Sequence, residues 1–87
     1  MFGVFKLSRI YYSFFMDFSV FRRKVGRKIR DLRLQRNLTQ EDMDEGDSGI
    51  PYRTIQNIEA GRSNPSLKTI HKLAKIFQIK PKDLLDV

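Results

Sequence analysis

Apolar residues recur at helical spacing along most of this chain. The first set begins after Ser19, with bases between its members and steps of four, four and three residues, which is the pattern of an amphipathic helix. Its members are Phe21, Val25, Ile29 and Leu32. We expect this helix to end near Asn37.

Start and stop signals predict four further short helices. Thr39 precedes an acidic first turn, Pro51 suits the start of a helix over residues 52–60, Ser66 can cap a fourth helix, and Pro81 opens a last turn. The fourth helix carries one apolar stripe, consisting of Leu67, Ile70, Leu73, Ala74 and Phe77. Five helices and no strand predict an all-α domain.

Composition excludes several classes of function. Eighty-seven residues allow one small domain, and the absence of Cys excludes disulfides and thiolate metal sites. No glycine-rich phosphate loop, metal-spaced cluster or Ser-His-Asp set is present, and His71 lies where a solvated helix residue is expected. We therefore expect no enzyme, no cofactor and no metal.

The net charge of +7 is unevenly distributed. Residues 22–36 carry eight Lys and Arg against Asp31 alone, residues 37–61 are acidic, and residues 62–87 are basic again. This order favours one positive face for a polyanion, with an acidic face turned away from it. A mixed, solvated surface is the alternative.

Two segments resemble the Cro and lambda-repressor-like (XRE) helix-turn-helix family. They are Leu-Thr-Gln-Glu-Asp-Met at residues 38–43 and the run at residues 52–67, which contains Thr-Ile-Gln-Asn-Ile-Glu-Ala-Gly and Gly-Arg-Ser-Asn-Pro-Ser-Leu. The resemblance covers about residues 24–86. It implies a compact five-helix domain whose third helix enters the major groove of double-stranded DNA while the second crosses the backbone.

The resemblance also implies roles for single residues. The outward positions of the third helix become base-reading candidates, namely Tyr52, Arg53, Gln56 and Asn57. Arginine can form two hydrogen bonds to guanine, and a side-chain amide can form two to adenine. Arg53 is therefore expected to read guanine or to hold a phosphate, and either Gln56 or Asn57 to read adenine. The phosphate-contacting candidates are Gln40, Thr54, Arg62, Ser63, Asn64 and Lys68. Arg33 and Glu59 are expected to form a structural ion pair.

The chain departs from the family pattern in the turn. It is one residue longer between Leu38 and Gly49, and Asp44 stands where the family has a small alanine. Because a buried, unpaired aspartate is costly, either the extra residue brings Asp44 to the surface or the second helix ends early.

Residues 1–18 form an apolar extension outside the resemblance, so we place the DNA-binding domain at residues 19–87. Two explanations of the extension stay open. It extends the first helix and packs on a second subunit, or translation starts at Met16 rather than Met1, with Asp17 or Ser19 as the helix cap. A membrane anchor is a poor fit, because Lys6, Arg9 and Asp17 interrupt the apolar run.

These observations predict a cytoplasmic, sequence-specific DNA-binding transcriptional regulator that acts as a homodimer on a pseudo-palindromic operator and does not bind a membrane. One alternative is an antitoxin or a restriction-modification controller of the same fold. Another is a protein-interaction module with a protein partner, in which DNA reading has been lost. The operator sequence and the sign of regulation are not encoded in these motifs.

Overall fold

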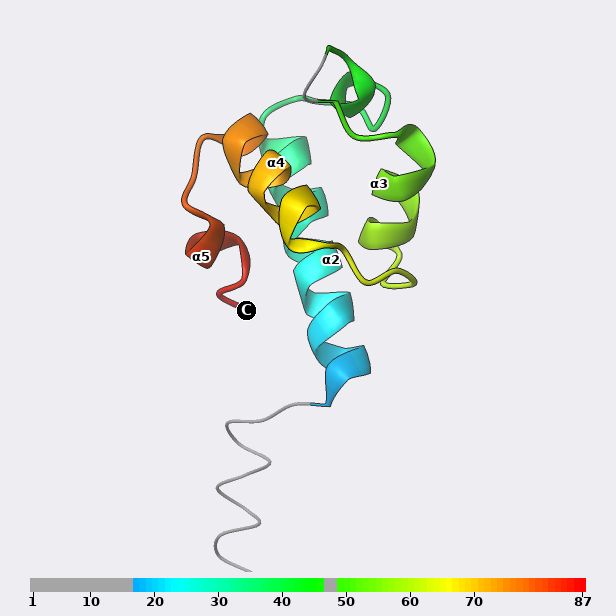
Figure 1. Ribbon diagram of the computed structural model, residues 1–87, viewed down its shortest axis with the longest axis vertical. Helices are drawn as coiled ribbons and strands as arrows, with labels where there is room; N and C mark the ends of the chain where they lie inside the picture. The colour runs from blue at the N-terminus through cyan, green and yellow to red at the C-terminus, as the bar shows by residue number, and fades with distance from the viewer. Residues whose placement is uncertain (1–16, 47–48) are drawn as a thin grey trace, which may run out of the picture.

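The computed structural model describes residues 17–46 and 49–87, and these residues form helices and no strand (Figure 1). The all-α class is therefore confirmed. The elements are α2 (Phe18–Gln35), the 3-10 turn η1 (Asp42–Asp44), α3 (Tyr52–Glu59), α4 (Leu67–Phe77) and α5 (Pro81–Leu84). Residues 1–16 of the apolar extension and the centre of the turn at residues 47–48 lie outside the described part of the chain, whereas Asp17 and Phe18 belong to the start of α2.

The first helix begins and ends close to the predicted positions. Asp17 is its N-cap, since the Asp17 Oδ1 accepts a hydrogen bond of 3.1 Å from the backbone N–H of Val20. After Gln35 the chain leaves the helix through Asn37, which has a positive φ of 56°. Asparagine tolerates this left-handed conformation better than most residues, which explains the stop.

The prediction of five helices is wrong for the described residues, which hold four α-helices. In place of the second helix there is one 3-10 turn, η1. Thr39 does accept the expected capping bond, since the Asp42 N–H donates to Thr39 Oγ1 at 3.0 Å, and the Thr39 N–H donates in return to Asp42 Oδ2 at 2.7 Å. However, Met43 is the one buried residue of η1, and Gly46 at φ 77° bends the chain away. Burial of a single apolar residue does not offset the conformational entropy that the chain would lose in forming a longer helix.

The core lies between α2 and the later helices. Its fully or nearly fully buried apolar residues are Val25, Ile29, Met43, Ile50, Ile55, Ile58, Ile70, Leu73, Ala74, Phe77 and Leu84. The predicted stripe of α4 is confirmed from Ile70 onward, but Leu67 is 84% exposed and does not belong to it. Leu67 is the first residue of α4, directly after the Ser66 cap, and that turn lies outside the core.

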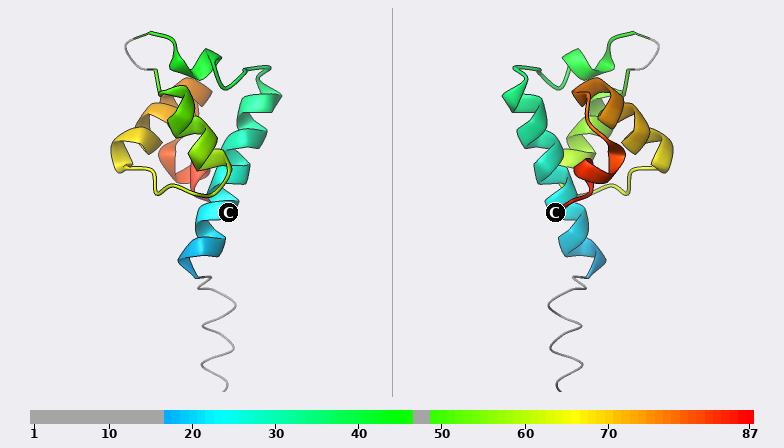
Figure 2. Two further views of the ribbon diagram at one scale, coloured as in Figure 1. Left: turned by 90° about the vertical axis from the view of Figure 1, so that its right-hand side faces the viewer. Right: turned by 90° about the vertical axis from the view of Figure 1, so that its left-hand side faces the viewer.

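The long helix α2 is the support on which the domain is assembled. It contacts α3, α4 and α5, and the views of Figure 2 show α3 and α4 gathered along the same helix. Arg36, just beyond α2, donates to the carbonyl oxygen of Phe77 from Nε at 3.1 Å and from Nη2 at 2.8 Å. This arginine satisfies a carbonyl at the C-terminal end of α4 and complements the dipole there.

Candidate nucleic-acid interface

Helix α3 is held against α2 by a close backbone approach. A Cβ at Gly26 would overlap the carbonyl oxygen of Ile58, so the crossing of α2 and α3 requires glycine. Ile55 and Ile58 are buried on the inner face of α3. The opposite face of α3 therefore points outward, toward the viewer in the left panel of Figure 2.

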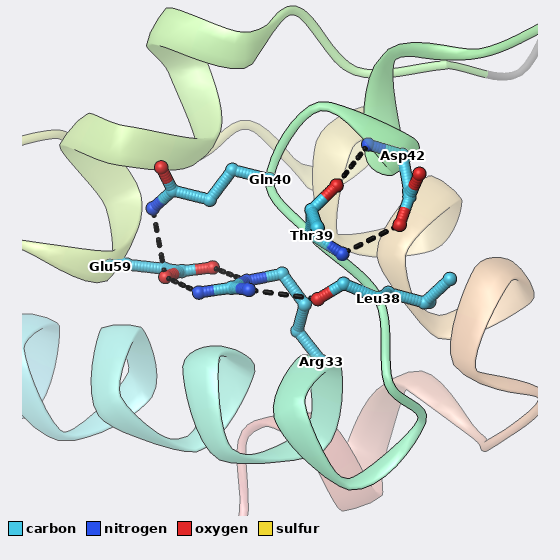
Figure 3. A network of polar contacts seen from close by, with 6 residues as sticks. All are labelled: Arg33, Leu38, Thr39, Gln40, Asp42 and Glu59. Carbon is cyan, nitrogen blue, oxygen red and sulfur yellow. Dashed lines mark hydrogen bonds and ion pairs between the residues drawn. The ribbon is translucent and has the colours of Figure 1, made fainter.

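The second support of α3 is a polar network at its C-terminal end (Figure 3). The Arg33 guanidinium forms a two-pronged ion pair with Glu59, with Nε to Oε2 at 2.7 Å and Nη2 to Oε1 at 2.9 Å. Its Nη1 donates to the carbonyl oxygen of Leu38 at 2.8 Å. Both charged side chains are almost buried, and the hydrogen bond that Arg33 donates to Glu59 raises the pKa of Arg33 above its usual value. The pair connects α2 to α3.

Gln40 joins the same network from the turn. Its Nε2 donates to Glu59 Oε1 at 3.1 Å, and its own Oε1 points away from the ion pair in Figure 3. Because a carboxylate only accepts, Glu59 determines which end of the Gln40 amide faces inward. Gln40 is half-buried, and the second N–H of its amide remains available to a further acceptor.

The N-terminal end of α3 is held by the turn. Pro51 is the N-cap residue and provides no side-chain cap, but Asp44 Oδ2 accepts a hydrogen bond of 3.3 Å from the backbone N–H of Tyr52. Asp44 is exposed, and the predicted second helix is reduced to the turn η1. Both of the explanations that the sequence offered for this aspartate therefore apply. A Cβ at Gly49 would lie 2.8 Å from the carbonyl carbon of Asp44, so glycine lets the turn close here.

The predicted base-reading side chains occupy the outer face of α3. Arg53 and Asn57 are exposed, whereas Tyr52 and Gln56 are half-buried. Gln56 Nε2 donates to the Tyr52 hydroxyl oxygen at 2.6 Å. Asn57 Oδ1 accepts two longer bonds from Arg62, from Nη2 at 3.3 Å and from Nε at 3.4 Å.

The predicted phosphate-contacting residues do not gather in one place. Gln40 and Arg62 border one shallow hollow beside α3, together with the base-reading candidate Gln56. Ser63 and Asn64 instead line a separate apolar groove, together with residues of α2 and α4. The remaining two are Thr54, which is half-buried in α3, and Lys68, which is exposed in α4.

The sequence interpretation did not single out Arg30. This exposed residue of α2 borders the hollow that contains Gln40, Gln56 and Arg62. Its spacing of three residues from Arg33 places both on the same side of α2, so helical periodicity combined with the expected ion pair would have identified it.

Within residues 17–46 and 49–87, no three His, Asp or Glu side chains are grouped so that they could hold a metal ion. Within the same ranges, no helix has the length and apolar character needed to cross a membrane.

Comparisons with known proteins agree with this geometry. The family model described as Helix-turn-helix matches residues 29–84. The cryptic phage CTXphi transcriptional repressor RstR of Vibrio cholerae is 40% identical over 58 residues, covering 67% of this chain and 51% of its own length. The chain therefore spans about half of that relative.

Restriction-modification proteins are also similar. The control protein C.BamHI of Bacillus amyloliquefaciens is 43% identical over 63 residues, which cover 70% of this chain and 75% of that protein. The crystal structure of the restriction-modification controller protein C.AhdI from Aeromonas hydrophila superposes with a TM-score of 0.64 at 35% identity, covering 71% of this chain and 92% of the other. The resemblance found in the sequence is confirmed, and the chain belongs to the XRE-type helix-turn-helix family.

Proposed function

We propose that the chain is a sequence-specific, double-stranded DNA-binding transcriptional regulator and not an enzyme, and that it acts in the cytoplasm as a homodimer. The observation that carries this proposal is the presentation of α3: its inner face is buried, both of its ends are held by the turn and α2, and its polar outer face is accessible. A rigid, outward-facing helix of this kind can enter a major groove. RstR is named as a transcriptional repressor, which agrees with this function.

In the proposed complex, the outer face of α3 reads bases. Arg53 is exposed and would contact guanine O6 and N7. Tyr52, Gln56 and Asn57 complete the reading surface. Phosphate contacts would come from Gln40, Thr54, Arg62, Ser63, Asn64 and Lys68, with Arg30 added because it shares the hollow of Gln40 and Arg62.

Charge supports the same polyanionic target. The hollow beside α3 has Arg30 and Arg62 on its border, while Glu59, its acid, is neutralised by Arg33. Without this ion pair, a carboxylate would repel a nearby phosphate. The pair therefore keeps the surface beside α3 compatible with DNA.

The homodimer is supported by apolar surface. Phe18 is 53% exposed and Leu67 is 84% exposed, and both border one apolar groove. Exposed apolar surface of this kind is typical of interaction sites. Two copies would present two α3 helices to successive major grooves, about 34 Å apart, and the operator would be pseudo-palindromic.

The experiment is fluorescence anisotropy with DNA from upstream of the chain's own gene and with a scrambled duplex, across salt. We expect preference for the upstream duplex, which Arg53→Ala abolishes while salt-dependent binding to scrambled DNA persists. Lys75→Ala removes the same charge from an exposed position of α4 and is the matched control. Equal binding of the wild-type chain to both duplexes, or binding to a protein and not to DNA, would contradict the proposal.

A restriction-modification controller is the second candidate. It is favoured by the alignment with C.AhdI, which extends over 92% of that protein, compared with 51% of RstR. A neighbouring endonuclease gene, and binding upstream of it, would support this candidate. Binding confined to phage promoters would contradict it.

A further inference from the structure

Two neighbouring amides on the outer face of α3 are held in different ways. Gln56 donates from Nε2 to the Tyr52 hydroxyl, which stands one helical turn earlier. Asn57 accepts at Oδ1 from the Arg62 guanidinium. The two side chains therefore present different atoms to a ligand, although both residues are amides.

The bonds to Tyr52 and Arg62 decide which hydrogen-bond donors and acceptors of each amide remain available to a ligand. A guanidinium only donates hydrogen bonds, so the oxygen of Asn57 must face Arg62 and its NH2 group faces away. A tyrosine hydroxyl can either accept or donate, and here it accepts from Gln56 Nε2, so Gln56 keeps its second N–H and its carbonyl oxygen. Gln56 thus offers a donor and an acceptor side by side, whereas Asn57 offers mainly donors.

Adenine in the major groove requires a donor and an acceptor side by side, which is what Gln56 offers. It presents an acceptor at N7 and a donor at N6, whereas guanine presents two acceptors at N7 and O6. We propose, on the basis of the DNA-binding function above, that Gln56 reads adenine, that Tyr52 is a positioning residue for it, and that Asn57 does not read adenine. Asn57 donates instead to a guanine, a thymine O4 or a phosphate.

The Tyr52 hydroxyl can serve in this way because Tyr52 itself is held. Its backbone N–H donates to Asp44 Oδ2 at 3.3 Å, and its side chain is half-buried. The unusual turn is thereby connected through Asp44 and Tyr52 to the amide of Gln56. A glutamine that is already oriented loses less conformational entropy when it binds a base than one that rotates freely in solvent.

The test selects preferred sequences from a random duplex library with the wild-type chain, Tyr52→Phe, Gln56→Ala, Asn57→Ala and the control Lys75→Ala. The preference at each position is then measured by anisotropy with single-base-pair variants of the wild-type site. We expect one A·T pair whose preference, about tenfold to hundredfold, disappears in Gln56→Ala and persists in Asn57→Ala and Lys75→Ala. In Tyr52→Phe it should fall about three- to tenfold, the effect of one lost hydrogen bond.

The base preference separates positioning from folding. Tyr52→Phe keeps the ring and should leave the melting temperature within about 2–4 °C, since only a hydroxyl on a half-buried side chain is removed. A uniform loss of affinity for every duplex would show a structural role and overturn the proposal, as would an unchanged A·T preference in Tyr52→Phe. Loss of the adenine preference in Asn57→Ala would also overturn it. Each of these outcomes would overturn the proposal while the wild-type chain still selects a preferred DNA sequence. If the wild-type chain selects no preferred sequence at all, the DNA-reading function itself is refuted.

Discussion

The ion pair between Arg33 and Glu59 makes the sharpest prediction about stability. Replacing Glu59 with alanine removes the two hydrogen bonds from Arg33 and the one from Gln40, and it leaves the Arg33 guanidinium in a site where the residue is only 7% exposed. Its remaining partner is the carbonyl oxygen of Leu38. The variant therefore leaves a charge buried without a counter-charge.

The expected cost follows from this burial. Breaking a buried pair from one side destabilises a protein by about 3–5 kcal/mol, of a total stability of about 5–15 kcal/mol. Since about 1 kcal/mol shifts the melting temperature of a domain of this size by about 4–8 °C, Glu59→Ala should lower it by at least about 12 °C. Removing both groups leaves no unpaired charge, so the double variant should be more stable than the sum of the single effects implies, by about 2–3 kcal/mol.

The assay is urea unfolding followed by circular dichroism for the wild-type chain, Arg33→Ala, Glu59→Ala and the double variant. Asp31→Ala, at an exposed position of α2, is the control and should change the free energy of unfolding by less than about 0.5 kcal/mol. If an alanine variant does not fold, the same measurement is made with Glu59→Gln, which keeps the shape of the side chain and one acceptor oxygen and should destabilise the domain less.

The result that would refute this reasoning is additivity. If the free-energy changes of Arg33→Ala and Glu59→Ala sum to that of the double variant within about 0.5 kcal/mol, the two side chains are not coupled. A Glu59→Ala variant as stable as the control would refute it equally. Loss of DNA binding without loss of stability would assign the pair to the interface and not to the fold.

Three further predictions concern other supports of the domain. Gly26→Ala should destabilise by about 2–3 kcal/mol because the added Cβ meets the Ile58 carbonyl, although the same change in an open helix stabilises; thermal melting decides the sign. Arg36→Leu should cost about 1–3 kcal/mol, because the Phe77 carbonyl loses two donors, and hydrogen exchange should speed up first at the end of α4. The hydrogen bond from the Thr39 backbone lowers the pKa of Asp42 from 3.8. The stability contributed by the Asp42 carboxylate is therefore present above pH 3.8 and is lost as the pH falls through the lowered pKa. Melting temperatures from pH 2 to 7 should show a shallower acid decline in Asp42→Asn than in the wild-type chain.

The apolar groove gives a separate prediction about assembly. Leu67→Glu places a charge beside the exposed Phe18 and should convert the proposed dimer to a monomer without lowering the melting temperature, because position 67 is outside the core. Sedimentation velocity measures the change. A dimer that survives Leu67→Glu and Phe18→Glu together would place the interface elsewhere.

Local signals in the sequence determined most of the helices. Caps and breakers act within a few residues of themselves, so Asp17, Asn37, Ser66 and Pro81 could be interpreted without knowing the fold. Periodicity likewise identified the buried faces of α2 and most of α4. The motif resemblance then indicated the family, and with it the expectation that Arg33 and Glu59 meet across 26 residues of sequence.

Only the tertiary structure decided the turn and the state of each polar side chain. Whether the segment after Thr39 is a helix depends on how much apolar surface it buries, and only Met43 of η1 is buried. The role of Asp44 depends on the position of the Tyr52 N–H, eight residues later. The orientation of the Gln56 amide depends on which neighbour faces it. Such contacts depend on where the backbone places each side chain, and a linear pattern of residue types does not contain that information.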